Sequence, residues 1–128
     1  MVTGLNHLTL AVKNLQRSIG FYTEILEFQI RRQTDHSCYL EAGILWLALV
    51  EEEADDFEVV ANGYSHVAFS VDVVKFPEAK KKLSDAGVKV WQHSDTDSSF
   101  YFLDPDGYQL EIHTGDLESR LSTFSAKK

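Results

Sequence analysis

An internal repeat constrains the fold of this chain more than any other feature of its sequence. Residues 5–12 read LNHLTLAV and residues 64–71 read YSHVAFSV, so an alternating, strand-like run follows a histidine in both copies. Each copy continues with apolar residues at helical spacing and then with three short extended runs. This self-similarity indicates two related β-α-β-β-β units, with His7 and His66 at equivalent positions.

The expected elements follow the repeat. In the first copy we expect strands at 4–12, 27–33, 37–42 and 44–50. In the second copy we expect strands at 64–72, 88–92, 98–103 and 108–113. A helix follows the first strand of each copy; Asn14 is the expected N-cap of the first helix, and Gly87 closes the second. The sequence DPDG at 104–107 predicts a tight turn before the last strand.

A chain of 128 residues has the length of one ordinary domain. We therefore expect a single α+β domain over residues 1–128. Its parts are a first unit over 1–50, an acidic linker over 51–61, a second unit over 62–115, and a C-terminal helix and tail over 116–128.

Side-chain alternation predicts a metal site. His7 shares one strand face with Thr9, and His66 lies in the matching place of the second copy. Glu111 lies between two apolar residues of the last strand, so its side chain points away from theirs. A single strand histidine is usually a surface or core residue, but the repeat favours ligands here. Two imidazoles and one carboxylate on three strands would leave metal positions open for substrate.

Composition narrows the class of protein. The chain is 44% hydrophobic and 25% charged, typical of a soluble globular protein, and it has no apolar run of membrane-spanning length. Its formal net charge of −8 argues against nucleic acid as the main partner. Without a signal peptide, and with Cys38 as the single cysteine, we expect a cytoplasmic protein that has no internal disulfide.

The chain resembles the vicinal oxygen chelate superfamily, the glyoxalase and bleomycin-resistance proteins. Within it, the chain is most similar to the fosfomycin-resistance glutathione transferases. The motifs that carry the resemblance are GLNHLTLAV at 4–12, CYL at 38–40, LWL at 45–47, SFYFLDPDG at 99–107, LEIH at 110–113 and GDLESRL at 115–121. They cover most of the chain up to Leu121.

The resemblance implies a cupped mixed sheet built from the two units and a domain-swapped homodimer. In that dimer His7 comes from one subunit, while His66 and Glu111 come from the other, around Mn(II) or another divalent metal. The implied reaction is addition of the glutathione thiol to the epoxide of fosfomycin, or of a related small phosphonate or epoxide. No protein nucleophile is needed, so Cys38 is interpreted as a packing residue.

The resemblance also implies substrate contacts. Thr9, Tyr101 and Arg120 match residues that contact the phosphonate. Aromatic side chains are expected to wall the cavity: Tyr39, Trp46 and Tyr64. The chain departs from the family pattern at Gln92, which replaces a lysine expected at the phosphonate. The family's potassium-binding loop lacks its glycine and asparagine here. Asp95 and Asp97 could still offer oxygen ligands, so potassium binding is left open.

Other functions stay open at this point. Another enzyme of the superfamily is one alternative: an epoxide hydrolase, a glyoxalase-like isomerase or an Fe(II) dioxygenase, since two histidines and a glutamate also suit that metal. A metal-free drug-binding protein is the other alternative. The ligand set of His7, His66 and Glu111 argues against the metal-free reading.

Overall fold

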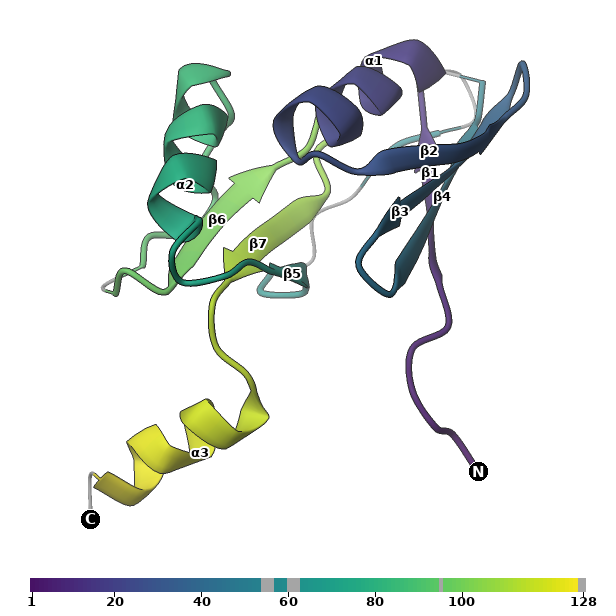
Figure 1. Ribbon diagram of the computed structural model, residues 1–128. Coiled ribbons are helices and arrows are strands. Elements are labelled where there is room, and N and C mark those ends of the chain that lie inside the picture. Colours follow the sequence, from purple (N-terminus) through teal and green to yellow (C-terminus); the bar gives the residue numbers. More distant parts are fainter. Residues whose placement is uncertain (54–56, 60–62, 95, 127–128) are drawn as a thin grey trace. The chain divides into compact units, whose positions relative to one another are not determined.

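The structure is a computed structural model that describes residues 1–53, 57–59, 63–94 and 96–126 (Figure 1). The chain forms two compact units, Met1–Ala61 with Asp104–Tyr108, and Asn62–Leu103 with Gln109–Lys128. Each unit carries helices and a sheet with both parallel and antiparallel pairs, so the expected mixed α+β fold is confirmed. The finer division into a single domain with a linker over 51–61 stays a prediction.

The first unit is built on a four-stranded sheet in the order β1-β4-β3-β2. Its strands are β1 (Leu8–Val12), β2 (Gln29–Gln33), β3 (Ser37–Ala42) and β4 (Leu45–Glu51). β1 runs parallel to β4, and the other pairs are antiparallel. Alternation buries one face, which contributes Leu10, Leu40, Leu47 and Leu49 to the core.

Helix α1 (Leu15–Gly20) packs on β3 and β4 of this sheet (Figure 1). The Asn14 side chain accepts a hydrogen bond of 3.0 Å from the Arg17 backbone N–H, so the expected N-cap is confirmed. The helix does not continue as a regular α-helix. It widens into the π-helical turn η1 (Phe21–Ile25), which buries the neighbouring side chains of Phe21 and Tyr22.

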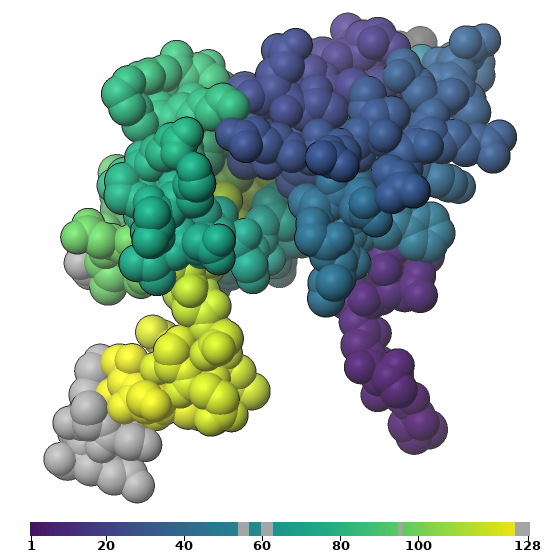
Figure 2. Space-filling model, in the orientation of Figure 1, coloured from purple at the N-terminus to yellow at the C-terminus, as the bar shows by residue number. Residues whose placement is uncertain are grey.

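The second unit contains a three-stranded sheet in the order β5-β7-β6. Its strands are β5 (Val67–Ser70), β6 (Ser99–Leu103) and β7 (Gln109–His113). Helix α2 (Phe76–Asp85) ends as expected: Gly87 has a φ of +77°, and its N–H donates to the Ser84 carbonyl oxygen. Helix α3 (Leu117–Ala126) follows β7, and its described side chains are exposed (Figure 2).

Three strand predictions need correction. The first strand of each copy is shorter than expected, because β1 begins at Leu8 and β5 at Val67. His7 and His66 therefore each lie one residue before a strand, where the ladder with the neighbouring strand has not begun. The expected strand at 88–92 is wrong. In place of a strand ladder, the segment has the isolated bridge between Gln92 and Tyr101 and a backbone hydrogen bond from the Leu103 N–H to the Lys89 carbonyl oxygen.

The tight turn at 104–107 is confirmed, and it belongs to the first unit although the strands on both sides of it belong to the second. Oδ1 of Asp104 accepts hydrogen bonds of 2.9–3.0 Å from the backbone N–H groups of Asp106, Gly107 and Tyr108. Oδ1 of Asp106 accepts from the Lys13 N–H and from the Arg17 guanidinium. These bonds join the turn to the segment around α1. No helix in the described part of the chain is long and apolar enough to cross a membrane.

Candidate active site

His66 and Glu111 form the centre of the candidate site in the second unit. Nε2 of His66 lies 2.9 Å from Oε1 of Glu111, which is 6% exposed. β7 brings the two together because Glu111 pairs with Ala68, two residues after His66. Glu111 points away from the buried Leu110 and Ile112, as its alternation predicts.

The hydrogen bond on the other side of the imidazole suits a metal ligand. Nδ1 of His66 donates to the Tyr64 carbonyl oxygen at 2.7 Å, so a neutral His66 presents its Nε2 lone pair to the carboxylate. The imidazole nitrogen and the carboxylate oxygen, 2.9 Å apart, can share either a proton or a metal cation. Adjacent ligands, each about 2.1 Å from a divalent metal, lie about 3 Å apart at a right angle. The pair therefore fits a divalent cation.

Aromatic rings surround this pair. Tyr64, Trp91 and Tyr101 each lie within ring contact of His66, with centroids 4.9–5.8 Å away. The hydroxyls of Tyr64 and Tyr101 are 3.3 Å apart. Burial, the hydrogen bond with Tyr64 and the nearby charge of Glu111 raise the pKa of Tyr101 to about 12. Tyr101 therefore stays a neutral hydroxyl donor at physiological pH.

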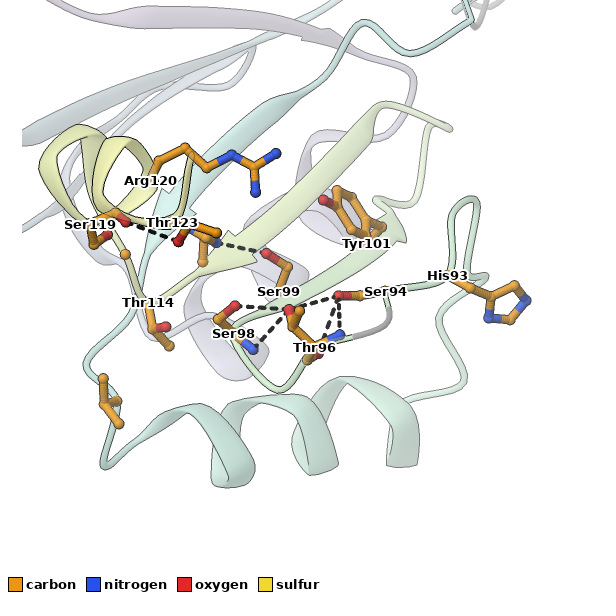
Figure 3. A pocket seen from close by; sticks show the side chains of 13 residues that line it. His93, Ser94, Thr96, Ser98, Ser99, Tyr101, Thr114, Ser119, Arg120 and Thr123 are labelled. Atoms are coloured by element: carbon orange, nitrogen blue, oxygen red, sulfur yellow. Dashed lines mark hydrogen bonds between the residues drawn. The ribbon is translucent and has the colours of Figure 1, made fainter. Parts of the chain in front are cut away.

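A cavity of about 580 Å³ opens beside Tyr101 (Figure 3). Hydroxyl side chains form much of its wall: Ser94, Thr96, Ser98, Ser99, Thr114 and Ser119. Arg120 from α3 also lines it, and its guanidinium lies 4.9 Å from the centre of the Phe124 ring. A guanidinium beside many hydroxyl donors suits a small oxyanion.

Two residues of this wall were missed as site residues in the sequence. The Ser99 hydroxyl lies 2.7 Å from Nδ1 of His113, and the same nitrogen is 3.4 Å from Oε2 of Glu111. A Cβ atom at Gly115 would lie 2.8 Å from Nε2 of His113, so glycine leaves room for the imidazole. Alternation already places His113, two residues after Glu111, on the same strand face, but that placement alone did not predict its contact with Ser99.

The first unit holds the other expected ligand. The His7 ring lies on Trp46, with centroids 4.2 Å apart, and Tyr39 contacts Trp46 edge-on at 5.4 Å. Thr9 and Tyr39 lie on the two strands that flank Ala48 of β4. The structure thus groups His7, Tyr39 and Trp46 on this face, with Thr9 on the adjacent strand.

The remaining expected residues divide between the units. Tyr101 and Arg120 line the cavity, but Gln92 does not. The side-chain amide of Gln92 donates to the His93 carbonyl oxygen at 3.4 Å. Figure 3 shows His93 pointing away from the hydroxyl groups. Asp95 of the expected potassium loop lies outside the described residues. Within the described ranges, no three His, Cys, Asp or Glu side chains gather as a metal-binding group.

Comparison with known proteins agrees with this architecture. Residues 4–112 match the model of the Glyoxalase/Bleomycin resistance protein/Dioxygenase superfamily. Glutathione transferase FosA of Serratia marcescens is 40% identical over 129 residues, which cover 99% of this chain and 92% of that protein. This chain belongs to the fosfomycin-resistance enzymes of that superfamily. The resemblance found in the motifs of the sequence is thereby confirmed.

Other members of the fosfomycin-resistance family extend the comparison. Metallothiol transferase FosB of Staphylococcus saprophyticus is 36% identical, with 100% of this chain and 87% of that protein covered. A crystal structure of FosX from Listeria monocytogenes, complexed with Mn(II) and sulfate, has a TM-score of 0.79 and 26% identity. The match covers 97% of this chain and 99% of that one. Metalloenzymes are thus found within the family.

Proposed function

We propose that this protein adds glutathione to the epoxide of fosfomycin, using a bound divalent metal, with Mn(II) as the first candidate. The observation that carries the proposal is the His66–Glu111 pair, whose spacing and imidazole tautomer suit a divalent cation. The 40% identity to a glutathione transferase and the Mn(II) complex of FosX support it.

We propose His7, His66 and Glu111 as the metal ligands. They belong to different units, which supports a homodimer in which His7 of one subunit completes the ligand set of the other. When bound, the metal would act as a Lewis acid that stabilises the negative oxygen formed as the epoxide opens. Imidazole and carboxylate ligands together suit Mn(II), and they also accept other divalent metals.

The cavity residues would bind and orient the substrate. Arg120 would pair with the phosphonate, and the Ser and Thr hydroxyls would donate to its oxygens. Tyr101, held neutral by its raised pKa, would supply a further hydroxyl donor. Thr9, with Tyr39, Trp46 and Tyr64 as aromatic walls, would complete the contacts. The described part of the cavity carries one guanidinium and no lysine.

The thiol supplies the nucleophile. The glutathione sulfur, having lost its proton, would form a bond to an epoxide carbon as the carbon–oxygen bond breaks, and the oxygen would then take up a proton. Cys38 is an unsuitable nucleophile, because it is 1% exposed and burial raises the pKa of its thiol. A cytoplasmic location would provide both a reduced Cys38 and glutathione.

The loop over residues 92–98 bears on phosphonate binding and on potassium binding. Gln92 provides a neutral amide where the family resemblance implies a lysine, so we expect weaker phosphonate binding than a lysine would give. Potassium binding at 92–98 stays open, as it does from the sequence. The Ser94, Thr96 and Ser98 hydroxyls bond to one another within the loop.

A second candidate is addition of water to the same epoxide. A variant of the Listeria FosX was crystallised with Mn(II) and 1S,2S-dihydroxypropylphosphonic acid, with a TM-score of 0.79 to this chain. That diol is what water addition to fosfomycin yields.

The test is turnover of fosfomycin by the Mn(II)-loaded protein with and without glutathione, followed by phosphorus NMR. An adduct that forms only with glutathione supports the proposal. A diol formed without thiol favours the second candidate. No product under either condition, with Mn(II) bound, would redirect the search to other superfamily reactions or to drug binding.

A further inference from the structure

The two histidines at the equivalent repeat positions are oriented by different kinds of acceptor. His66 donates from Nδ1 to a backbone carbonyl, that of Tyr64. His7 donates from Nδ1 to a side chain, Oδ1 of Asn6, at 2.7 Å. The residue equivalent to Asn6 in the second copy is Ser65, whose side chain makes no hydrogen bond within the described residues. Only the first copy therefore depends on a side chain for this bond.

The bond to Asn6 has a chemical consequence for the ring. A carboxamide oxygen only accepts hydrogen bonds, so with Oδ1 of Asn6 facing the ring the bond requires the proton of His7 on Nδ1. In a neutral imidazole the lone pair then lies on Nε2, which has no hydrogen-bond partner among the residues that the structure describes. A metal binds a histidine through such a lone pair.

Trp46 restrains the same ring from its face. The two ring centroids are 4.2 Å apart at an interplanar angle of 30°. The face contact and the in-plane bond at Nδ1 act in different directions, so together they fix both the plane of the imidazole and its rotation within that plane. Residues 1–7 are exposed and lie outside the strands, so the bond and the ring contact are the local restraints on His7 (Figure 2).

We propose that Asn6 is a positioning residue that holds His7 in the Nδ1–H tautomer and so presents Nε2 as a metal ligand. The inference rests on the proposed function, because it assigns His7 to the metal. Partners of this kind, which bond to a ligand's other nitrogen, typically change metal affinity by about 10–100-fold when removed. Asn6 would therefore act on binding without touching the metal or the substrate.

The test compares four forms of the full-length protein: wild type, Asn6→Ala, Asn6→Asp and Ser65→Ala. The histidine tautomers are measured first, in metal-free protein, by nitrogen-15 NMR at a pH where the imidazoles are neutral. Mn(II) affinity is then measured by electron paramagnetic resonance. Ser65→Ala is the matched control, because it truncates the equivalent side chain before the other histidine.

We expect His7 to carry its proton on Nδ1 in wild type and in Asn6→Asp, which keeps the acceptor. In Asn6→Ala we expect a shift toward the Nε2–H form and Mn(II) binding weaker by about 10–100-fold. His66 should keep its tautomer in all four forms, and Ser65→Ala should bind Mn(II) like wild type.

Either of two results would overturn the inference: an unchanged His7 tautomer in Asn6→Ala, or a changed tautomer with unchanged Mn(II) affinity. Failure of the proposed function has a different signature. In that case wild type itself does not bind Mn(II), while the tautomer measurement still reports whether Asn6 orients the ring.

Discussion

The Tyr22 hydroxyl donates a 2.7 Å hydrogen bond to Oδ2 of Asp104, and both side chains are almost fully buried. The other carboxylate oxygen accepts three backbone N–H groups of the turn. Burial raises the pKa of Asp104, and the bond from Tyr22 opposes that rise. Burial and the adjacent Asp104 charge also raise the pKa of Tyr22 well above its ordinary value. The bond thus stabilises an otherwise costly buried carboxylate.

Tyr22→Phe should destabilise the protein by about 1.5–3 kcal/mol at neutral pH, the range for a hydrogen bond to a charged group. Because the pKa of Asp104 is raised on folding, its contribution to stability falls as pH rises through the folded pKa. Loss of the tyrosine bond raises that pKa further. The variant should therefore lose more stability at neutral than at acidic pH, as measured by urea unfolding across pH.

Tyr108→Phe is the control for this prediction. The Tyr108 hydroxyl donates to the neutral Ala11 carbonyl at 2.9 Å. Loss of this hydrogen bond should lower the free energy of unfolding by about 1 kcal/mol at neutral and at acidic pH alike. Equal losses for Tyr22→Phe at neutral and acidic pH would show that Asp104 does not change its ionisation state over this range.

The split ligand set can be tested by mixing inactive variants. Glu111→Gln and His7→Ala should each reduce Mn(II) affinity and turnover while leaving the folded protein intact. If His7 acts across a dimer, co-expression should restore active sites, because one site of each mixed dimer holds all wild-type ligands. Random pairing of equal amounts gives about a quarter of the wild-type sites. Folding is checked by circular dichroism, and no restored turnover would mean that the ligands come from one chain.

Gly115→Ala should disturb the Ser99–His113 hydrogen bond. The new Cβ would lie 2.8 Å from Nε2 of His113 and 2.7 Å from the Ser119 hydroxyl, so a side chain must move. We expect a loss of about 1–3 kcal/mol in unfolding free energy and a raised KM for fosfomycin.

Gly20→Ala is the matched substitution, because a Cβ at this helical glycine meets nothing within 4 Å. It should be neutral or slightly stabilising. In a His113→Ala background, the cost of Gly115→Ala should shrink. If Gly115→Ala costs as much unfolding free energy in the His113→Ala background as in wild type, the destabilisation comes from the contact with Ser119.

Tyr64→Phe should lower the pKa of Tyr101 from about 12, because it removes one of the contacts that raise it. Burial and Glu111 would remain, so the pKa should stay above the ordinary value. Carbon-13 NMR of labelled tyrosine in metal-free protein measures this directly. Added Mn(II) should lower the pKa of Tyr101 further by offsetting the Glu111 charge. A pKa of Tyr101 that responds neither to Tyr64→Phe nor to Mn(II) would contradict the assigned contacts.

Gln92→Lys should improve use of fosfomycin if the phosphonate binds near this loop. A charged hydrogen bond in place of a neutral one is worth about 1.5 kcal/mol, or about tenfold in KM. Gln16→Lys, on the exposed side of α1, adds the same charge elsewhere. Steady-state kinetics should show a lower KM for Gln92→Lys and an unchanged KM for Gln16→Lys. Equal changes in KM would mean that the added net charge, and not its position, causes the effect.

Local spacing and alternation allowed the helix caps and the direction of Glu111 to be predicted, and the repeat allowed the order of the elements to be predicted apart from one strand of the second copy. The strand at 88–92 was wrong, since Val88, Val90 and Trp91 have strand propensity but pair with the sheet at a single bridge. His113 and Ser99 were missed as site residues because their contact joins two strands, and pairing register is not visible in either strand alone. The contact between Tyr22 and Asp104 spans 82 residues and was equally invisible.

The grouping of Asp104–Tyr108 with the first unit has a consequence for synthesis of the chain on the ribosome. The buried hydroxyl of Tyr22 acquires its acceptor only when Asp104 has left the exit tunnel, long after the four strands of that unit have emerged. A fragment that stops at Ala61 would carry the whole sheet and still lack this acceptor. The first repeat therefore cannot satisfy its own buried tyrosine when the chain is cut at its midpoint.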